Sequence, residues 1–415
     1  MHVSAWPGLS PAYLLGRPTA PLPFPLSEPN KAFFYVARNG IYHLFRELVR
    51  HHDGAVLVPD YHSGNEVWAI RAAGAPVQFY RIDRGLQPDL DQIKELAGNK
   101  PLAIYLIHFI GWPQPVAEIA ELCRERGILL VEDCALSMLS ASEGRPLGSF
   151  GDYSVYCLYK TLPVPNGGLL VGDRAVLDKV RDIELRASSR VSVAGRSLEL
   201  GLEWVRNRHE PLGEALFRAK RGVGQALSRM SVERTPVGDI GFNLDNVDLG
   251  MSPVCRRLLD RFDYEAIRSR RRENFFLMRE LLAGAATPLR ADLDDGVCPL
   301  FFPILVADKR RAAEALWGAG IEAVQFWNYG DQEAQRDRSS DAQFLRDHVL
   351  ELPIHQDVTA RQIEYTAEHV RALESVVRID AAAAAKAARP ERRPPRPRPP
   401  EPLDEPDAVR SAPPA

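Results

Sequence analysis

The sequence has few cysteines, no apolar run long enough to cross a membrane, and almost no net charge. Its five cysteines are an odd number without metal-ligand spacing, which argues against a disulfide framework or a metal site and favours a reducing compartment. The N-terminus lacks the basic-then-apolar pattern of a signal peptide. A net charge of −3 over 415 residues gives no argument for nucleic acid or membrane partners. We therefore expect a cytoplasmic protein without such partners.

Strand-like apolar segments alternate with one-sided helical segments in the first part of the chain. The strand-like runs lie at 33–36, 55–59, 76–80, 102–107, 127–131, 153–159 and 169–171. This alternation is typical of an α/β protein with a doubly wound, mostly parallel sheet. In such sheets ligands bind outside the carboxyl ends of the strands, so the residues that follow each strand are the candidate site residues.

The alternation stops after residue 173, and we divide the chain accordingly. The expected parts are an N-terminal proline-rich surface arm (1–32), a large α/β domain (33–250) with a helical insertion at about 185–235, a small C-terminal α+β domain (251–378), and a tail (379–415). Within the small domain we expect one long helix over 254–283, a strand at 322–327, and a last helix opened by a Thr359–Gln362 capping box. The tail is rich in proline, arginine and glutamate and should be disordered.

An acid and a lysine follow neighbouring predicted strands. Asp133 follows the run that ends at Val131, and Lys160 follows the run 153–159, before a turn with Gly167 and Gly168. A pyridoxal phosphate site needs these groups, because a lysine amine forms a Schiff base with the aldehyde and a carboxylate pairs with the pyridinium nitrogen. Separately, Asp133 could cap a helix and Lys160 could be a solvated turn lysine. Together with the glycine turn they favour the cofactor site.

Two further strand ends carry candidate ligands. The turn at 37–40 precedes a one-sided helix, whose free N–H groups could bind a phosphate. Taken by itself, however, this stretch is better explained as an ordinary turn before an ordinary helix. The loop at 60–64 contains the ring-bearing side chains Tyr61 and His62.

These motifs resemble the DegT/DnrJ/EryC1/StrS sugar aminotransferases, which are fold-type I pyridoxal phosphate enzymes. The resemblance covers roughly residues 33–375. It rests on VEDCA at 131–135, GRPLGSFGD at 144–152, the lysine before a Gly-Gly turn, and LELPIHQDVTARQIEY at 350–365. IHFIGWP at 107–113 and VPDYHSG at 58–64 are similar to further family segments.

The resemblance implies a role for each matching residue. Lys160 would form the Schiff base and move the proton during transamination, and Asp133 would bind the pyridine nitrogen. Arg38 and Asn39 would hold the phosphate through backbone amides. Tyr61 or His62 would stack on the ring.

The chain also departs from the family pattern around the cofactor. Leu136 replaces a His or Gln against the ring, and Cys157 replaces a serine that donates to the phosphate. Asn166 replaces the Glu before the Gly-Gly turn, and Lys160 comes two residues early. These departures leave a catalytically inactive binding relative open as an alternative.

The resemblance implies a transferase that uses pyridoxal 5'-phosphate and no metal. It would move an amino group from glutamate or glutamine to the keto group of a nucleotide-linked sugar, in polysaccharide or secondary-metabolite biosynthesis. The family also implies a homodimer. A dehydratase on the same scaffold is a second alternative, although that branch usually lacks the lysine.

Overall fold

The structure is a computed structural model that describes residues 1–16, 21–209, 211–213, 215–216, 241–325, 327–335 and 340–373. The predicted disordered tail (379–415) and residues 217–235 of the predicted insertion lie outside these residues. Among the helices of the described ranges, none is both long and apolar enough to span a lipid bilayer.

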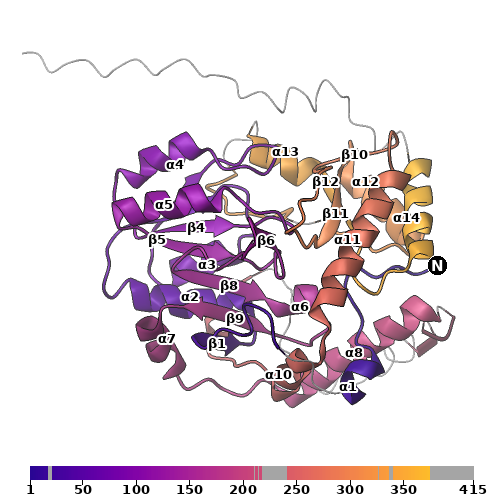
Figure 1. Ribbon diagram of the computed structural model, residues 1–415, viewed down its shortest axis with the longest axis horizontal. Helices are drawn as coiled ribbons and strands as arrows, with labels where there is room; N and C mark the ends of the chain where they lie inside the picture. The colour runs from indigo at the N-terminus through magenta and orange to yellow at the C-terminus, as the bar shows by residue number, and fades with distance from the viewer. Residues whose placement is uncertain are drawn as a thin grey trace, which may run out of the picture.

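A seven-stranded sheet forms the centre of the large domain, with strand order β1-β9-β8-β5-β4-β2-β3 (Figure 1). The strands are β1 (Lys31–Phe34), β2 (Val56–Pro59), β3 (Val77–Tyr80), β4 (Ala103–Ile107), β5 (Leu129–Asp133), β8 (Tyr153–Cys157) and β9 (Gly168–Gly172). Neighbours from β3 to β8 pair in parallel, and β9 is antiparallel to both β8 and β1. The prediction of a mostly parallel α/β sheet is confirmed.

Helices connect these strands and lie against the sheet. They are α2 (Ala37–Leu48), α3 (Asn65–Ala72), α4 (Leu90–Ala97), α5 (Val116–Arg126), α6 (Leu158–Thr161) and α7 (Arg174–Arg181), with a small hairpin of β6 (Ala141–Ser142) and β7 (Arg145–Pro146). Helix α5 ends at Gly127 with a φ of +65°, a left-handed cap that glycine adopts without strain and that turns the chain into β5. Strands β2, β4 and β8 are buried along their whole length, as expected for a sheet covered on both faces.

The small domain has a three-stranded antiparallel sheet and lies to the right of the central sheet in Figure 1. Its elements are β10 (Thr287–Pro288), β11 (Phe301–Leu305), β12 (Val349–Pro353), α12 (Lys309–Gly318), α13 (Asp341–His348) and α14 (Ala360–Ala372). The predicted capping box is present: the Thr359 side chain accepts from the Gln362 amide, and the Gln362 side chain accepts from the Thr359 amide.

Two predicted elements of the small domain differ from the structure. The expected helix over 254–283 is divided into α10 (Pro253–Leu258), a 3-10 turn (Leu259–Arg261) and α11 (Tyr264–Leu281), because Asp263 caps a new helix by accepting from the amide of Ala266. Of the described residues in the expected strand, 322–325 and 327, Val324 alone is paired, in an isolated bridge with Glu351. The Trp327 ring packs against Tyr61 of the loop after β2.

The sequence predicted a surface arm over residues 1–32, but residues 1–9 are largely buried. Val3 and Leu9 are buried, and Val3 forms a parallel bridge with Ile321 of the small domain. The amide of Leu9 donates to the carbonyl of Leu200 on α8 (Arg190–Arg208), a helix of the predicted insertion. Residues 1–9 are therefore wedged between the small domain and α8, and α1 (Pro11–Leu15) follows them.

Candidate active site

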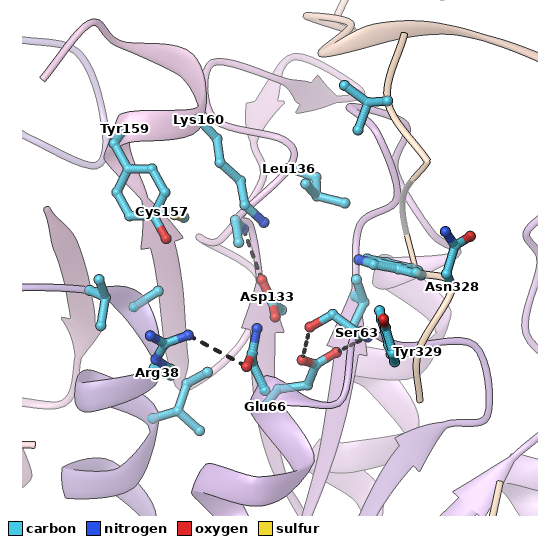
Figure 2. Close-up of a pocket in the computed structure, with 18 of the residues that line it drawn as sticks. Arg38, Ser63, Glu66, Asp133, Leu136, Cys157, Tyr159, Lys160, Asn328 and Tyr329 are labelled. Atoms are coloured by element: carbon cyan, nitrogen blue, oxygen red, sulfur yellow. Dashed lines mark hydrogen bonds between the residues drawn. The ribbon is translucent and has the colours of Figure 1, made fainter. Parts of the chain in front are cut away.

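A cavity of about 320 Å³ lies at the carboxyl ends of β5 and β8, where the large domain meets the small one (Figure 2). Its inner half is lined by residues from the central sheet and the helices that follow it, including Arg38, Asp133, Cys157 and Lys160. The opposite side is lined by Trp6, Val324, Gln325, Trp327, Asn328 and Tyr329, a set that we call the outer wall. In Figure 2 Asn328 and Tyr329 lie across the cavity from Arg38 and Tyr159.

Asp133 is the buried acid of the inner half. It is the last residue of β5, and its carboxylate accepts from the Tyr105 hydroxyl at 2.6 Å and from the Ala135 amide at 2.8 Å. Burial raises the pKa of Asp133, while these two donors and the positive charge of Lys160 partly oppose the rise. A cation placed next to this carboxylate would remove the cost of burying its charge.

Lys160 extends its amine into the same space. It lies on α6, a short helix that begins one residue after β8, and not on the strand end itself. Figure 2 shows its side chain directed toward Asp133. Asp133 and Lys160 therefore lie close together, as the sequence predicted. The lysine, however, lies on α6 and not on the end of β8.

The Gly-Gly turn brings the start of α2 next to α6. The amide of Gly167 donates to the carbonyl of Tyr35, and its carbonyl accepts from Leu158. A Cβ on Gly168 would lie 2.3 Å from the carbonyl carbon of Val36, so only glycine permits this approach. The turn thus fixes the N-terminus of α2 beside the lysine.

Arg38 and Asn39 stand in the first turn of α2 but point in different directions. Val36 is the N-cap of α2, and its side chain makes no capping hydrogen bond to the first turn. Arg38 lines the cavity, and its Nη1 donates to Asn65 at 3.4 Å. The amide of Asn39 donates to Val36, and its side chain donates to the carbonyl of Asn246. Asn39 is thus part of the scaffold behind the cavity.

Tyr61 and His62, predicted to stack on a cofactor ring, do not line the cavity. The Tyr61 ring is buried against Phe109 and Trp327. The His62 ring stacks on Phe79, and burial lowers its pKa well below the usual range. The sequence showed that aromatic groups follow β2, but side-chain packing against the small domain decided which of them face inward.

Ser63 and Glu66 line the cavity in their place, and the sequence analysis missed both. Ser63 donates to the Glu66 carboxylate through its amide at 2.8 Å and its hydroxyl at 2.5 Å. Burial raises the pKa of Glu66, and the nearby charge of Asp133 raises it further. The inner half therefore contains two buried carboxylates. The position of Glu66 in the first turn of a helix after a strand-end loop was the signal that could have identified it.

Three predicted departures from the family pattern have clear positions. Leu136 and Cys157 line the cavity, and burial raises the pKa of the Cys157 thiol, so it stays protonated. Asn166 is buried and accepts from the amide of Ser252, the N-cap residue of α10. Asn166 therefore connects the Gly-Gly turn to the start of α10.

Glu132, the residue before Asp133, has a structural role behind the cavity. Its carboxylate lies 3.0 Å from Nε2 of His108 and also accepts from the amides of Gly148, Phe150 and Gly151. Burial alone would raise the pKa of Glu132, but these hydrogen bonds hold it below its usual value. The carboxylate anchors the loop between β7 and β8 and takes no part in the cavity.

Arg346 joins the outer wall to the large domain. Its buried guanidinium donates to the carbonyls of Asp60 and His62 at 3.0 Å each, and to the carbonyls of Trp327 at 2.8 Å and Tyr329. Trp327 has a φ of +54°, a backbone conformation that is uncommon for a bulky residue and that these contacts help to hold. One side chain thus ties the loop after β2 to the residues that close the cavity.

The sheet, the small domain and the cavity at the carboxyl edge define a type I fold of the pyridoxal phosphate-dependent transferases. The fold is similar to the solved structure of the aminotransferase TlmJ from Streptoalloteichus hindustanus, with a TM-score of 0.61 at 19% identity. The superposition covers 90% of this chain and 98% of the TlmJ chain. Residues 47–204 match the model of the DegT/DnrJ/EryC1/StrS aminotransferase family. The resemblance inferred from the sequence is thereby confirmed.

Two curated relatives align with part of this chain. GDP-perosamine synthase of Vibrio cholerae is 31% identical over 144 residues, which are 34% of this chain and 38% of the relative. The dTDP-4-dehydro-2,3,6-trideoxy-D-glucose 4-aminotransferase of Saccharopolyspora spinosa is 30% identical over 153 residues, 36% and 40% of the two chains. The chain thus aligns with about two fifths of the length of these relatives. The family match includes Asp133 and Lys160 but neither Arg38 nor the outer wall.

Proposed function

We propose that this protein is an aminotransferase that uses pyridoxal 5'-phosphate and transfers an amino group from an amino acid to a keto sugar. The observation that carries the proposal is the Lys160 amine directed toward the buried carboxylate of Asp133. The family match and the aminotransferase fold support it.

The donor set of the inner half fits this cofactor. Asp133 offers an anion for the protonated pyridine nitrogen, and its Tyr105 and Ala135 donors fix the orientation of the carboxylate. Leu136 supplies an apolar contact for one face of the ring. The uncapped N-terminus of α2 offers amide groups and a positive dipole end to the phosphate.

Arg38 adds a permanent positive charge to the phosphate site. Cys157 is a weak hydrogen-bond donor at a position where the family has serine. A guanidinium binds phosphate more strongly than a neutral hydroxyl does, because its hydrogen bonds are charge-assisted. We therefore assign phosphate binding to the Arg38 side chain and the first amides of α2, while Asn39 holds α2 in place.

Bound at Lys160, the cofactor supplies an aldehyde that condenses with amines and a conjugated ring that withdraws electrons. Lys160 would hold the cofactor through Nζ, and Nζ would also accept and return a proton at the reacting carbon of the substrate. Asp133 would keep the ring nitrogen protonated. The surrounding buried residues exclude water from this proton transfer.

The substrates follow from the relatives and from the family. Both curated relatives are named for nucleotide-linked sugars, so a nucleotide-linked keto sugar is the proposed acceptor, and glutamate or glutamine is the proposed donor. The pathway would be polysaccharide or secondary-metabolite biosynthesis. We also propose a cytoplasmic homodimer, since closed two-fold dimers are the commonest soluble assemblies. Sedimentation of an active monomer at micromolar concentration would contradict the dimer.

Absorption spectroscopy tests the function directly. The purified protein loaded with pyridoxal 5'-phosphate should show a visible band that borohydride bleaches and that glutamate or glutamine converts to the amine form. Product analysis with a nucleotide-linked keto sugar should then give an amino sugar. A protein that binds no chromophore would be an inactive relative, and a product that lost a hydroxyl without gaining nitrogen would indicate a dehydratase.

A further inference from the structure

We infer that Trp6 is a specificity-determining residue that contacts the sugar ring of the acceptor substrate. The N-terminal segment 1–9 and α8 hold Trp6 in this position. The inference rests on the proposed function and extends it to a residue outside the family match. Trp6 lies in a segment that the sequence suggested was a surface arm, yet it lines the cavity. Its ring packs edge-on against Phe301 of β11 at 5.2 Å.

Hydrogen bonds fix the backbone on the small-domain side of Trp6. The carbonyl of Ser4 lies 2.9 Å from Nε2 of His355, and the Ser4 hydroxyl donates to the carbonyl of Trp6 at 2.8 Å. The amide of Ala5 donates to the Glu322 carboxylate at 3.1 Å. Since Glu322 lies two residues before Val324, the anchor of the N-terminal segment is continuous with the outer wall.

Helix α8 fixes the other side of the segment. The Asn207 side chain accepts from the Ser4 amide at 3.2 Å and donates to the Ser4 hydroxyl at 2.7 Å. Nε2 of His2 lies 3.0 Å from the Glu203 carboxylate. A Cβ on Gly8 would lie 2.5 Å from the backbone nitrogen of Trp204, so the two backbones are in close contact. This gives the first part of the predicted insertion a role, since it clamps residues 2–8 in place.

The chemistry of the outer wall points to a sugar. It combines the indoles of Trp6 and Trp327 with the amides of Gln325 and Asn328 and the hydroxyl of Tyr329. Aromatic faces pack against the C–H faces of a sugar ring, and amides and hydroxyls pair with its hydroxyl groups. The wall has no charged side chain for the α-carboxylate of an amino acid donor. A neutral polyol is therefore the ligand that matches it.

The experiment compares nucleotide sugars with the matching nucleoside diphosphates. Dissociation constants of dTDP-glucose and dTDP, and of GDP-mannose and GDP, are measured by calorimetry on the cofactor-loaded protein. For at least one pair, the wild type should bind the sugar-bearing nucleotide about tenfold more tightly than the diphosphate. In Trp6→Ala the ratio of the two dissociation constants, diphosphate over sugar nucleotide, should fall to within twofold of unity. The affinity for the diphosphate and the melting temperature should stay unchanged.

Two further variants separate contact from folding. Trp6→Phe keeps a ring against Phe301 and should lower the ratio only about threefold, which remains measurable if Trp6→Ala proves unstable. Trp317→Phe is the matched control, because this indole is 48% exposed on α12 and does not line the cavity; its ratio should equal that of the wild type.

Three results would overturn the inference. They are a wild type that binds neither sugar nucleotide better than its diphosphate, a Trp6→Ala variant that keeps the full ratio, and a loss of affinity that is equal for sugar and diphosphate. Each leaves the proposed function standing if glutamate or glutamine still converts the visible band.

Discussion

The two halves of the cavity are built from different parts of the chain. The inner half, with Asp133 and Lys160, comes from strand ends and helix starts of one sheet, and these two residues lie 27 positions apart in the sequence. The outer wall joins Trp6 with residues 324–329, which meet only because the N-terminal segment is wedged against the small domain. The half that we assign to the cofactor is therefore encoded locally. The half that we assign to the substrate is encoded by long-range packing.

This difference implies a division of labour that mutations can separate. Changes in the inner half should alter the chromophore and the chemical step with little effect on stability, because these side chains point into the cavity. Changes behind the outer wall should alter stability and sugar binding and leave the chromophore intact. The predictions below test this separation, beginning with the largest expected effect.

Lys160→Ala should abolish the visible band and lower transamination by at least about a thousandfold, roughly 4 kcal/mol of barrier, because Lys160 is the lysine that lines the cavity with Asp133. The melting temperature should change little, since the side chain is only half-buried. Peptide mapping after borohydride reduction of the wild type checks the attachment site. Lys179→Ala, an exposed lysine of α7, is the control; a label on Lys179 would refute the assignment.

Asp133→Asn should lower the rate by about a hundredfold, close to 3 kcal/mol, because the ring nitrogen loses its anionic partner. The cofactor should still bind, with lower affinity. Steady-state kinetics and titration with pyridoxal 5'-phosphate measure the two effects. Tyr105→Phe removes one donor to the carboxylate and should cost less than Asp133→Asn does. Wild-type rates in the asparagine variant would contradict the role.

The largely buried carboxyl group of Asp60, in the loop that Arg346 joins to the outer wall, should make folding stability depend on pH. Burial raises the pKa of Asp60 to about 7 from an ordinary value near 3.8, so the folded protein holds this proton more tightly than the unfolded chain does. Folding stability should therefore fall as the pH rises from about 4 to 7. Asp60→Asn cannot titrate, so its stability relative to the wild type should grow by about 3 kcal/mol between pH 4.5 and 7.5.

Urea unfolding of both proteins at the two pH values measures this difference. The chromophore of the Asp60→Asn variant should match the wild type, because Asp60 does not line the cavity. A constant stability difference across this pH range would show that Asp60 is not the titrating group.

Arg346→Lys should destabilise the protein by about 2 kcal/mol, because an ammonium cannot reach all four carbonyls that the planar guanidinium contacts. Release of Trp327 and Tyr329 should also weaken nucleotide-sugar binding while the visible band persists. Denaturant unfolding and calorimetry give the two values. Arg310→Lys on the exposed face of α12 is the control and should behave as wild type. A bleached chromophore in Arg346→Lys would mean that the two halves are not separable.

Features of the fold and of the cavity could be predicted from the sequence when they depend on residues close together in the chain. The alternation of strands and helices predicted the parallel sheet, because the periodicity of buried side chains is a local property. Asp133 and Lys160 could be placed together because the carboxyl ends of parallel strands meet at one edge. The capping box at Thr359 was equally local and was confirmed. The break at Asp263 in the predicted helix over 254–283 was also encoded locally, as a capping residue, and was overlooked.

The sequence by itself thus determined the sheet, its carboxyl edge and the acid–lysine pair. Only the tertiary structure decided that Tyr61 and His62 turn away from the cavity, and that the N-terminal segment is buried. The tertiary structure also decided which residues form the outer wall. Side-chain direction in a loop depends on which distant surface it packs against, and Tyr61 packs on Trp327, 266 positions later in the chain. No periodicity or spacing encodes such a contact, because it forms only when segments far apart in the sequence pack together.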